Sequence, residues 1–227
     1  MHGGMKSSLA FSCSCLLAAA ALVFSHDSAS AADRELQARK NTASVLMPHW
    51  GKPVFIRIIK EDAELELWLR QGEEWQVFRT YEIAAMSGEL GPKQQEGDCQ
   101  APEGFYRVVR SALNPKSSYY LSFNIGYPNK YDRSLGRTGS HIMVHGSNVS
   151  IGCFAMTDPG IEQIYTLVAA ALRAGQPYVP VQVYPFRMTP ERMRLEQDHE
   201  FYDFWLHLLP GWQHTEQHAE PFPDRDN

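Results

Sequence analysis

Four short runs of alternating apolar and polar residues constrain the fold of this chain more than any other feature. They are VFIRII (54–59), LELWLR (65–70), WQVFRTYEIA (75–84) and FYRVVR (105–110). Alternation with a period of two residues predicts β-strands, and the Glu-Asp and Gln-Gly breaks between the runs predict antiparallel hairpins. Three later segments also have the character of strands: YYLSFNI (119–125), HIMVHG (141–146) and VPVQVY (179–184).

The pattern becomes helical towards the C-terminus. Apolar residues recur at helical spacing after Pro159, which follows Asp158 in the position of an N-cap, so we expect a helix over 159–174. A second helix is expected within 189–212, ending before Pro210. The chain therefore predicts a mainly β fold, a mixed sheet folded into a barrel or sandwich, with peripheral α-helices.

The N-terminus has the layout of a secretory signal peptide. Lys6 precedes an apolar run over 9–24, and the small residues Ala29, Ser30 and Ala31 follow it. The run is shorter than the roughly 20 residues of a membrane-spanning helix. We expect cleavage near Ala31 and export of the mature protein.

These signals divide the chain into five parts. We expect a signal peptide (1–31), an N-terminal segment (32–52), a catalytic domain (53–187), a C-terminal helical extension (188–212) and a disordered tail (213–227).

The charge balance argues against nucleic acid as a partner. The chain has 21 Lys and Arg against 26 Asp and Glu, a formal charge of −5, and no basic cluster of the kind that binds phosphates. Two long segments rich in Gly, Pro, Asn and Asp, 88–104 and 126–140, are expected to be loops. Long loops on a β scaffold often carry function.

The run HGSNVSIGC contains the strongest candidate site. His145 ends a predicted strand, and a turn-forming segment leads to Gly152 and Cys153. A thiol of ordinary pKa, about 8.5, becomes a good nucleophile when an imidazole or an oriented dipole stabilises its thiolate. Gly152 would let a substrate approach the backbone, where N–H groups could hold an oxyanion.

Other interpretations of these residues remain open at this point. His141, His145 and Cys153 are candidate zinc ligands, although two histidines four residues apart on a strand are separated by about 13 Å and could not share one ion. Cys99 could instead form a structural disulfide with Cys153, or a reversible one. A papain-like protease is excluded because its cysteine precedes its histidine.

Two further segments accompany this motif. Gly97-Asp98 precedes Pro102-Glu103-Gly104, and YYLSFNIGYPNKYDRSLGRTGSHIMVHG leads into the S-x-G-C run. In this order the segments resemble the L,D-transpeptidase catalytic domain family (the YkuD type) over roughly residues 54–186, and most closely its YafK-like branch. The resemblance implies a histidine-activated cysteine that attacks an amide carbonyl in peptidoglycan stem peptides. For that branch it implies release of a lipoprotein from its lysine linkage to diaminopimelate.

Carried onto this sequence, the resemblance makes Cys153 the nucleophile and His145 the base, with Ser150 and Gly152 shaping the turn and the oxyanion site. Ser150 is equally compatible with a turn serine that bonds its own backbone. The resemblance implies a periplasmic enzyme without metal or organic cofactor. A thioester at Cys153 would be resolved by water in a hydrolase, which we favour, or by an amine in a transpeptidase. A third hypothesis is an inactive peptidoglycan-binding module.

Substrate-binding candidates lie just upstream of the motif. Arg133 and Arg137 could hold a stem-peptide carboxylate, and Tyr127, Tyr131 and His141 are further candidates. The sequence also departs from the family pattern, because many members have an arginine two residues after the cysteine, where this chain has Ala155.

Overall fold

The structure is a computed structural model that describes residues 33–34 and 36–223. It divides into two compact units, 1–47 and 48–227, which are described separately. In the first unit, residues 36–46 are helical. The expected signal peptide and its cleavage near Ala31 lie outside the described residues. None of the helices that the structure describes is both long and apolar enough to cross a membrane.

The second unit contains a five-stranded sheet that begins with the predicted hairpins. Strands β1 (Val54–Ile59), β2 (Glu64–Gln71) and β3 (Glu74–Glu82) pair antiparallel in chain order. On the other side, β1 pairs parallel with β9 (Val179–Tyr184), which pairs antiparallel with β4 (Gly104–Val108). The order is β3-β2-β1-β9-β4. β1 is buried along its whole length, so the expected alternation does not hold for VFIRII, in which Arg57 is the one polar residue.

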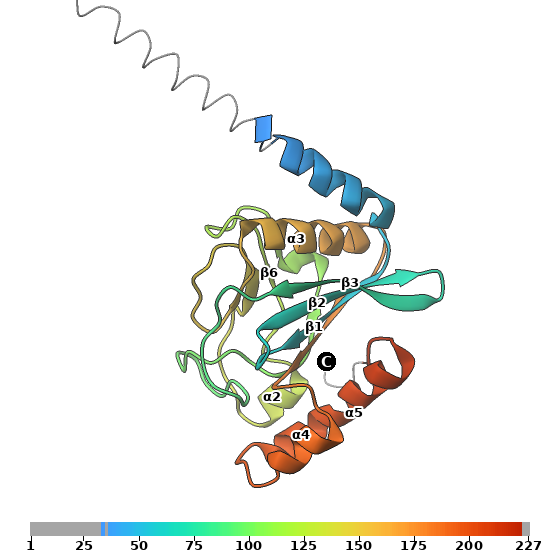
Figure 1. Cartoon of the computed structure of the whole chain (residues 1–227). Helices are drawn as coiled ribbons and strands as arrows, with labels where there is room; N and C mark the ends of the chain where they lie inside the picture. The colour runs from blue at the N-terminus through green and yellow to red at the C-terminus, as the bar shows by residue number, and fades with distance from the viewer. Residues whose placement is uncertain (1–32, 35, 224–227) are drawn as a thin grey trace, which may run out of the picture. The chain divides into compact units, whose positions relative to one another are not determined.

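A second, smaller sheet carries the histidine-cysteine motif. Its order is β5-β6-β7-β8, with bounds β5 (Leu113–Asn114), β6 (Ser122–Asn124), β7 (Met143–His145) and β8 (Phe154–Ala155). β7 and β8 are parallel, and the other pairs are antiparallel. With its helices at the periphery, the fold confirms the expected mainly β class, built as two sheets (Figure 1).

Helix α3 (Asp158–Arg173) contacts strands of both sheets, β1 and β9 of the larger and β6 and β7 of the smaller. It confirms the expected helix, but its N-cap is Thr157, whose hydroxyl accepts a hydrogen bond from the Gly160 N–H. The prediction of Asp158 as the cap was wrong by one residue. Asp158 instead accepts from the Ser147 N–H at 2.8 Å, which ties the helix to the loop after β7. The remaining short helices are η1 (Met47–His49), η2 (Arg110–Ala112) and α2 (Lys130–Ser134).

The C-terminal region differs from the sequence-based prediction. Instead of one helix that ends before Pro210, the structure has α4 (Pro190–Leu195) and α5 (Tyr202–His218), and α5 continues through the proline. The expected disordered tail is therefore wrong for residues 213–218. Proline inside a helix removes a backbone hydrogen bond, but α5 buries aromatic and aliphatic side chains against the larger sheet, and such packing supplies most helix stability in proteins. The buried side chains of α5 in this core are Phe204, Trp205, Leu208 and Trp212.

A buried ion pair joins the loop before β4 to the larger sheet. The Lys60 ammonium, whose residue is 3% exposed, contacts Glu103 Oε1 at 2.9 Å and the carbonyls of Glu89, Gly91 and Ala101 at 2.9–3.0 Å. The Trp205 Nε1–H donates to Glu103 Oε2 at 2.8 Å. Glu103 is fully buried, so the network satisfies both charges and fixes the loop.

Lys60→Met is expected to lower the free energy of unfolding by about 3 kcal/mol, because it leaves the Glu103 carboxylate buried without its counter-ion. Urea denaturation measures this change. Arg187→Met is the matched control, since its close pairs with Asp62 and Glu64 lie at the surface, where ion pairs contribute about 0–1 kcal/mol. The buried Glu66, which Arg187 also faces at 3.6 Å, keeps Arg57 as its counter-ion in this variant. Equal losses in the two variants would contradict a structural role for the buried pair.

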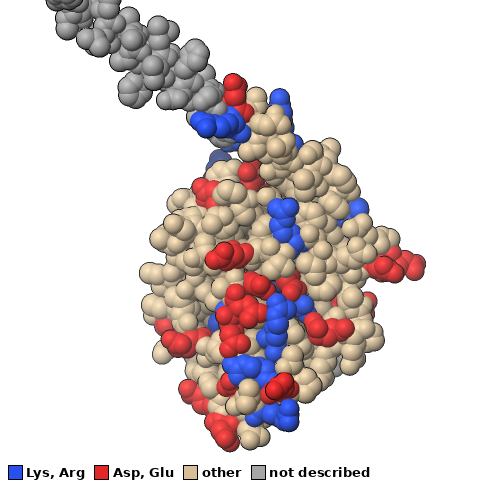
Figure 2. All heavy atoms as spheres, viewed as in Figure 1, with Lys and Arg blue, Asp and Glu red and all other residues tan. Residues whose placement is uncertain are grey.

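On the face of the molecule shown in Figure 2, acidic and basic side chains lie side by side, without a broad patch of either sign among the described residues. Surface ion pairs of this kind include Arg187 with Asp62 and Arg192 with Glu61, both at 2.7 Å. This face offers no basic surface of the kind that binds nucleic acid.

Candidate active site

The parallel pairing of β7 and β8 brings His145 and Cys153 together. Val144 pairs with Phe154 and His145 with Ala155, so Cys153, which directly precedes β8, is a diagonal neighbour of His145. Strand spacing then separates the Cα atoms of these two residues by about 8 Å. This distance is within reach of an imidazole and a thiol that point toward each other.

The Cys153 thiol is held by backbone groups of the strand beside it. Its Sγ accepts from the Met143 N–H at 3.3 Å, and the thiol donates to the His141 carbonyl at 3.6 Å. Burial raises the pKa of the thiol, opposed by the Met143 hydrogen bond and by the positive charge of Lys93. The thiol is therefore protonated at neutral pH in the free protein.

The His145 imidazole is 4% exposed and oriented by its own chain. Nδ1 lies 2.6 Å from the Gly146 carbonyl oxygen. A carbonyl only accepts, so this contact assigns the proton to Nδ1 and leaves Nε2 of the neutral ring as the acceptor. Burial lowers the imidazole pKa, and the Gly146 contact offsets part of this shift. The Tyr119 ring lies against the imidazole, with 4.8 Å between centroids.

Both pKa shifts favour a neutral thiol beside a neutral imidazole over a thiolate beside an imidazolium. The chemistry that fits this arrangement is transfer of the thiol proton to Nε2 as the sulfur attacks a bound substrate, which is general-base activation of a nucleophile. Burial of the two groups favours this neutral pair over the preformed thiolate beside a cationic histidine that the motif alone suggests.

Gly152 shapes the turn before the cysteine, as predicted, but its amide is already engaged. Its φ of +75° lies in the left-handed region that favours glycine. The Gly152 N–H donates to Ser87 Oγ at 2.7 Å, and Ser87 Oγ donates to the Cys99 carbonyl at 2.6 Å. The Gly152 N–H is therefore not available to an oxyanion. The Ser150 hydroxyl is buried without a hydrogen-bond partner among the described residues, so the structure does not join it to the imidazole.

Gly146 leaves no room for a side chain beside the catalytic histidine candidate. A Cβ at this position would lie 2.6 Å from both the Tyr119 carbonyl oxygen and Asp158 Oδ1. One of these atoms is backbone, and the Gly146 N–H donates to that same carbonyl at 3.1 Å, so a substitution must displace the loop itself.

Gly146→Ala is expected to destabilise the protein by about 1–3 kcal/mol through this overpacking. Thermal or urea unfolding tests it. Gly160→Ala, in the first turn of α3, is the control because its Cβ would meet nothing closer than 3.3 Å, and alanine is the better helix former. A Gly146→Ala protein as stable as the Gly160→Ala protein would show that the loop yields freely.

The upstream candidates for substrate binding have structural partners. Arg137 pairs with the buried Asp132 at 2.8 Å and lies over the Phe204 ring at 4.5 Å. Arg133 donates to the Pro128 carbonyl of the same loop. These contacts fix the 126–140 loop against α5 and explain both arginines without a substrate.

The two tyrosines of this loop also pack against the protein. The Tyr127 hydroxyl donates to the carbonyls of Lys93 at 3.1 Å and Thr138 at 3.2 Å. Tyr131 stacks on His207, with 4.0 Å between ring centroids. Neither side chain is among the groups that contact Cys153 or His145.

His141 contributes its backbone and not its imidazole to the thiol. Its φ of +58° breaks the strand predicted over 141–146, which is reduced to β7. This turn directs the His141 carbonyl toward the Cys153 Sγ. The earlier estimate of the distance between His141 and His145 assumed one regular strand over both residues, and that assumption is wrong. The described residues contain no group of three or more His, Cys, Asp or Glu side chains placed to hold a metal ion.

Sequence reasoning did not single out three neighbours of the site. Ser87 anchors Gly152, Tyr119 lies on the imidazole, and Lys93 places a positive charge near the thiol. Ser87 and Lys93 come from segments remote from the motif, whereas Tyr119 begins the YYLSFNI segment that was expected to be a strand.

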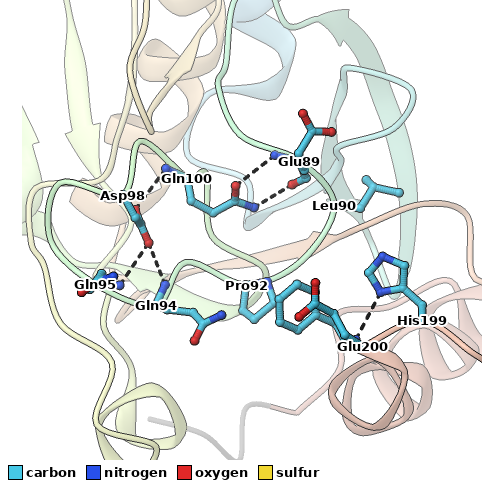
Figure 3. Close-up of a pocket in the computed structure, with 10 residues that line it drawn as sticks. Glu89, Leu90, Pro92, Gln94, Gln95, Asp98, Gln100, His199 and Glu200 are labelled. Carbon is cyan, nitrogen blue, oxygen red and sulfur yellow. Dashed lines mark hydrogen bonds between the residues drawn. The ribbon is translucent and has the colours of Figure 1, made fainter.

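Two cavities lie near these elements. One, of about 640 Å³, is lined by residues that include Tyr119, Tyr120, Ser147 and Asp158. The Tyr119 ring lies against the imidazole, but neither His145 nor Cys153 lines this cavity. The other, of about 600 Å³, lies between the 89–100 loop and the α4–α5 connection and includes neither Cys153 nor His145 (Figure 3). Glu89, Asp98 and Glu200 contribute carboxylates to its lining. The Asp98 carboxylate already accepts hydrogen bonds from the backbone N–H groups of Gln94, Gln95 and Gln100.

Comparisons with known proteins identify the family. Solved structures similar to this chain include Pgp2 of Campylobacter jejuni, a helical cell shape determining protein, with 24% identity and a TM-score of 0.48, over 60% of this chain and 48% of that one. The chain thus spans about half of Pgp2. L,D-transpeptidase 1 of Mycobacterium tuberculosis is 17% identical with a TM-score of 0.30, over 59% and 62% of the two chains.

The sequence relatives are closer. YafK of Escherichia coli K12, whose name assigns it provisionally to the L,D-transpeptidases, is 49% identical over 171 residues, 75% of this chain and 70% of that protein. YafK of E. coli O157:H7 gives the same values. The model of the YkuD family, the L,D-transpeptidase catalytic domain, matches residues 53–183. The chain therefore belongs to the L,D-transpeptidase catalytic domain family.

Proposed function

We propose that this protein is an exported, periplasmic cysteine enzyme that cleaves an amide bond at meso-diaminopimelate in peptidoglycan, releasing a lipoprotein from its lysine linkage. Membership of the L,D-transpeptidase family supports peptidoglycan as the substrate class. The observation that carries the proposal is the Cys153 thiol diagonal to an imidazole whose Nδ1 is fixed on the Gly146 carbonyl.

In the proposed reaction, Cys153 Sγ attacks the amide carbonyl while Nε2 of His145 takes the thiol proton. The tetrahedral intermediate collapses to a thioester as the C–N bond breaks, and His145 returns the proton to the leaving amine. Water then attacks the thioester, His145 accepts one of its protons, and the carboxylic acid and the free thiol are released. The cavity beside Tyr119 is the proposed location of one arm of the substrate.

Hydrolysis is proposed over cross-linking because of the residue two positions after the cysteine. Ala155 stands where many family members have an arginine, and it is fully buried, with its N–H donating to the Ala85 carbonyl at 2.9 Å. No guanidinium extends from this position to hold a second substrate. The choice between hydrolysis and aminolysis of one thioester depends on such positioning of an acceptor amine.

The test is incubation with sacculi that carry a covalently attached lipoprotein, or a lysine-terminated peptide of it, followed by muropeptide analysis. Release of the free lysine end supports hydrolysis. New 3-3 cross-links or exchange of a terminal D-amino acid, without release, would establish the transpeptidase alternative. Binding to sacculi without any change in muropeptides would indicate a binding module and overturn the proposal.

A further inference from the structure

A second cysteine lies beside the candidate nucleophile. A Cβ built on Gly152 would lie 3.5 Å from the Gln100 carbonyl oxygen and 3.9 Å from the Cys99 carbonyl carbon. The backbone that carries Cys99 is therefore packed against the residue bonded to Cys153. Standard bond lengths then limit the distance between the Cα atoms of Cys99 and Cys153 to about 11 Å. A disulfide requires about 4.4–6.8 Å, so a loop movement of a few ångströms at most brings them to bonding distance.

The Ser87 hydroxyl holds the backbones of the two cysteine segments together. Ser87 Oγ donates to the Cys99 carbonyl at 2.6 Å and accepts from the Gly152 N–H at 2.7 Å. The bridge uses no cysteine side chain. The proximity of the two segments therefore does not depend on either thiol and persists when Cys99 is substituted.

Both thiols are free and weakly held. Cys99 is exposed, and its thiol donates to the Gly97 carbonyl at 3.6 Å, while the Cys153 thiol donates to His141 at the same distance. Cys99 also has a φ of +55°, a left-handed conformation that is strained for a residue with a side chain. Neither sulfur is fixed by a strong contact that opposes rotation toward the other.

We propose that Cys99 and Cys153 form a reversible disulfide that switches the enzyme off. The proposed bond is argued from the proximity of the two segments, whereas its effect on turnover rests on the proposed function of Cys153 as nucleophile. Once its sulfur is bonded to Cys99, Cys153 has no thiolate with which to attack a carbonyl. A reductant breaks the disulfide and restores the Cys153 thiol, so the inactivation is reversible.

The proposed oxidant is a disulfide, either a small one such as oxidised glutathione or the disulfide of a thiol-disulfide oxidoreductase. The exposed Cys99 loses a proton to solvent and attacks the oxidant, breaking its S–S bond and releasing one thiolate. Cys153, deprotonated in turn, attacks the Cys99 sulfur of this mixed disulfide and releases the second thiolate. The two electrons from the cysteines reduce the oxidant to two thiols, which take up the two protons.

The test treats the full chain with oxidised glutathione or with dithiothreitol, blocks free thiols with N-ethylmaleimide, and maps peptides without reduction. Mapping separates the Cys99–Cys153 linkage from peptides that contain Cys13 or Cys15. The expected result is a linked peptide in the oxidised protein, absent after dithiothreitol and absent in the Cys99→Ser and Cys153→Ser variants. Turnover of sacculi is expected to be lost on oxidation and restored by dithiothreitol.

The Cys99→Ser variant separates the switch from the chemistry. It is expected to keep wild-type turnover under reducing conditions and to acquire only a glutathione adduct at Cys153 on oxidation. Mixed glutathione disulfides at both cysteines of the wild type, without the linked peptide, would overturn the switch. A linked peptide in a protein that shows no turnover even when reduced would support the disulfide and refute the proposed function instead.

Discussion

The Cys153→Ala protein is expected to lose turnover of sacculi by at least about 10⁴-fold, because removing the nucleophile of a cysteine enzyme leaves only binding and polarisation of the substrate. The fold should survive. The thiol makes only two weak sulfur hydrogen bonds, to Met143 and His141, and it is not part of the core of either sheet. Muropeptide release measures the rate, while circular dichroism and urea denaturation check the fold.

Cys99→Ser is the matched control for this loss. Its side chain is exposed and contacts only the Gly97 carbonyl, so turnover under reducing conditions should equal that of the wild type. If Cys153→Ala keeps turnover within tenfold of the wild type, the nucleophile lies elsewhere.

His145→Ala is expected to lower turnover by about 10³-fold, within the range of 10²–10⁴ that a positioned general base contributes. The imidazole is buried and its Nδ1 is tied to Gly146, which leaves Nε2 as the basic atom of the neutral ring. His141→Ala is the control, because only the backbone of His141 contacts the thiol and its exposed ring should be dispensable. Equal losses in the two variants would refute the assignment of His145 as the base.

The pH dependence gives a readout that a purely structural role for His145 would not produce. Burial lowers the imidazole pKa below its ordinary 6.5, so the ring remains neutral, and competent as a base, down to a lower pH than a free histidine. The midpoint of the acid limb of kcat/KM should therefore lie below pH 6.5, and the limb should be absent from the His145→Ala protein. If the acid limb is unchanged by this substitution, a group other than His145 is responsible for it.

Alkylation of the resting enzyme tests the state of the thiol. Because burial raises the pKa of Cys153, its reaction with iodoacetamide should increase with pH through a midpoint above the ordinary thiol value of about 8.5. A midpoint near or below pH 6 would instead reveal a preformed thiolate and imidazolium.

Local patterns in the sequence were sufficient for the hairpins of the larger sheet and for α3, but not for the short strands β7 and β8 that bring His145 and Cys153 together. The alternation in residues 54–84 predicted β1, β2 and β3 and their antiparallel order, and helical spacing predicted α3 to within one residue at each end. These predictions succeeded because a strand or helix that buries one face must repeat its apolar residues with the period of its own backbone. The same local reasoning failed for α5, where burial of Trp205 and Trp212 against the sheet outweighs the effect of Pro210.

The sequence by itself determined which residues are candidates for the chemistry, because His145 and Cys153 stand eight positions apart in a run that resembles the motif of one family. It did not determine their surroundings. Arg137 was a candidate ligand for a carboxylate until the fold paired it with the buried Asp132, and Ser87 gave no signal until the fold placed it between Cys99 and Gly152. Such contacts join residues 5 to 65 positions apart, and beyond one helical turn or one strand pair no local period encodes them. Only the packing of the two sheets and their loops decided the protonation of the site, the anchoring of its turn and the proximity of its second thiol.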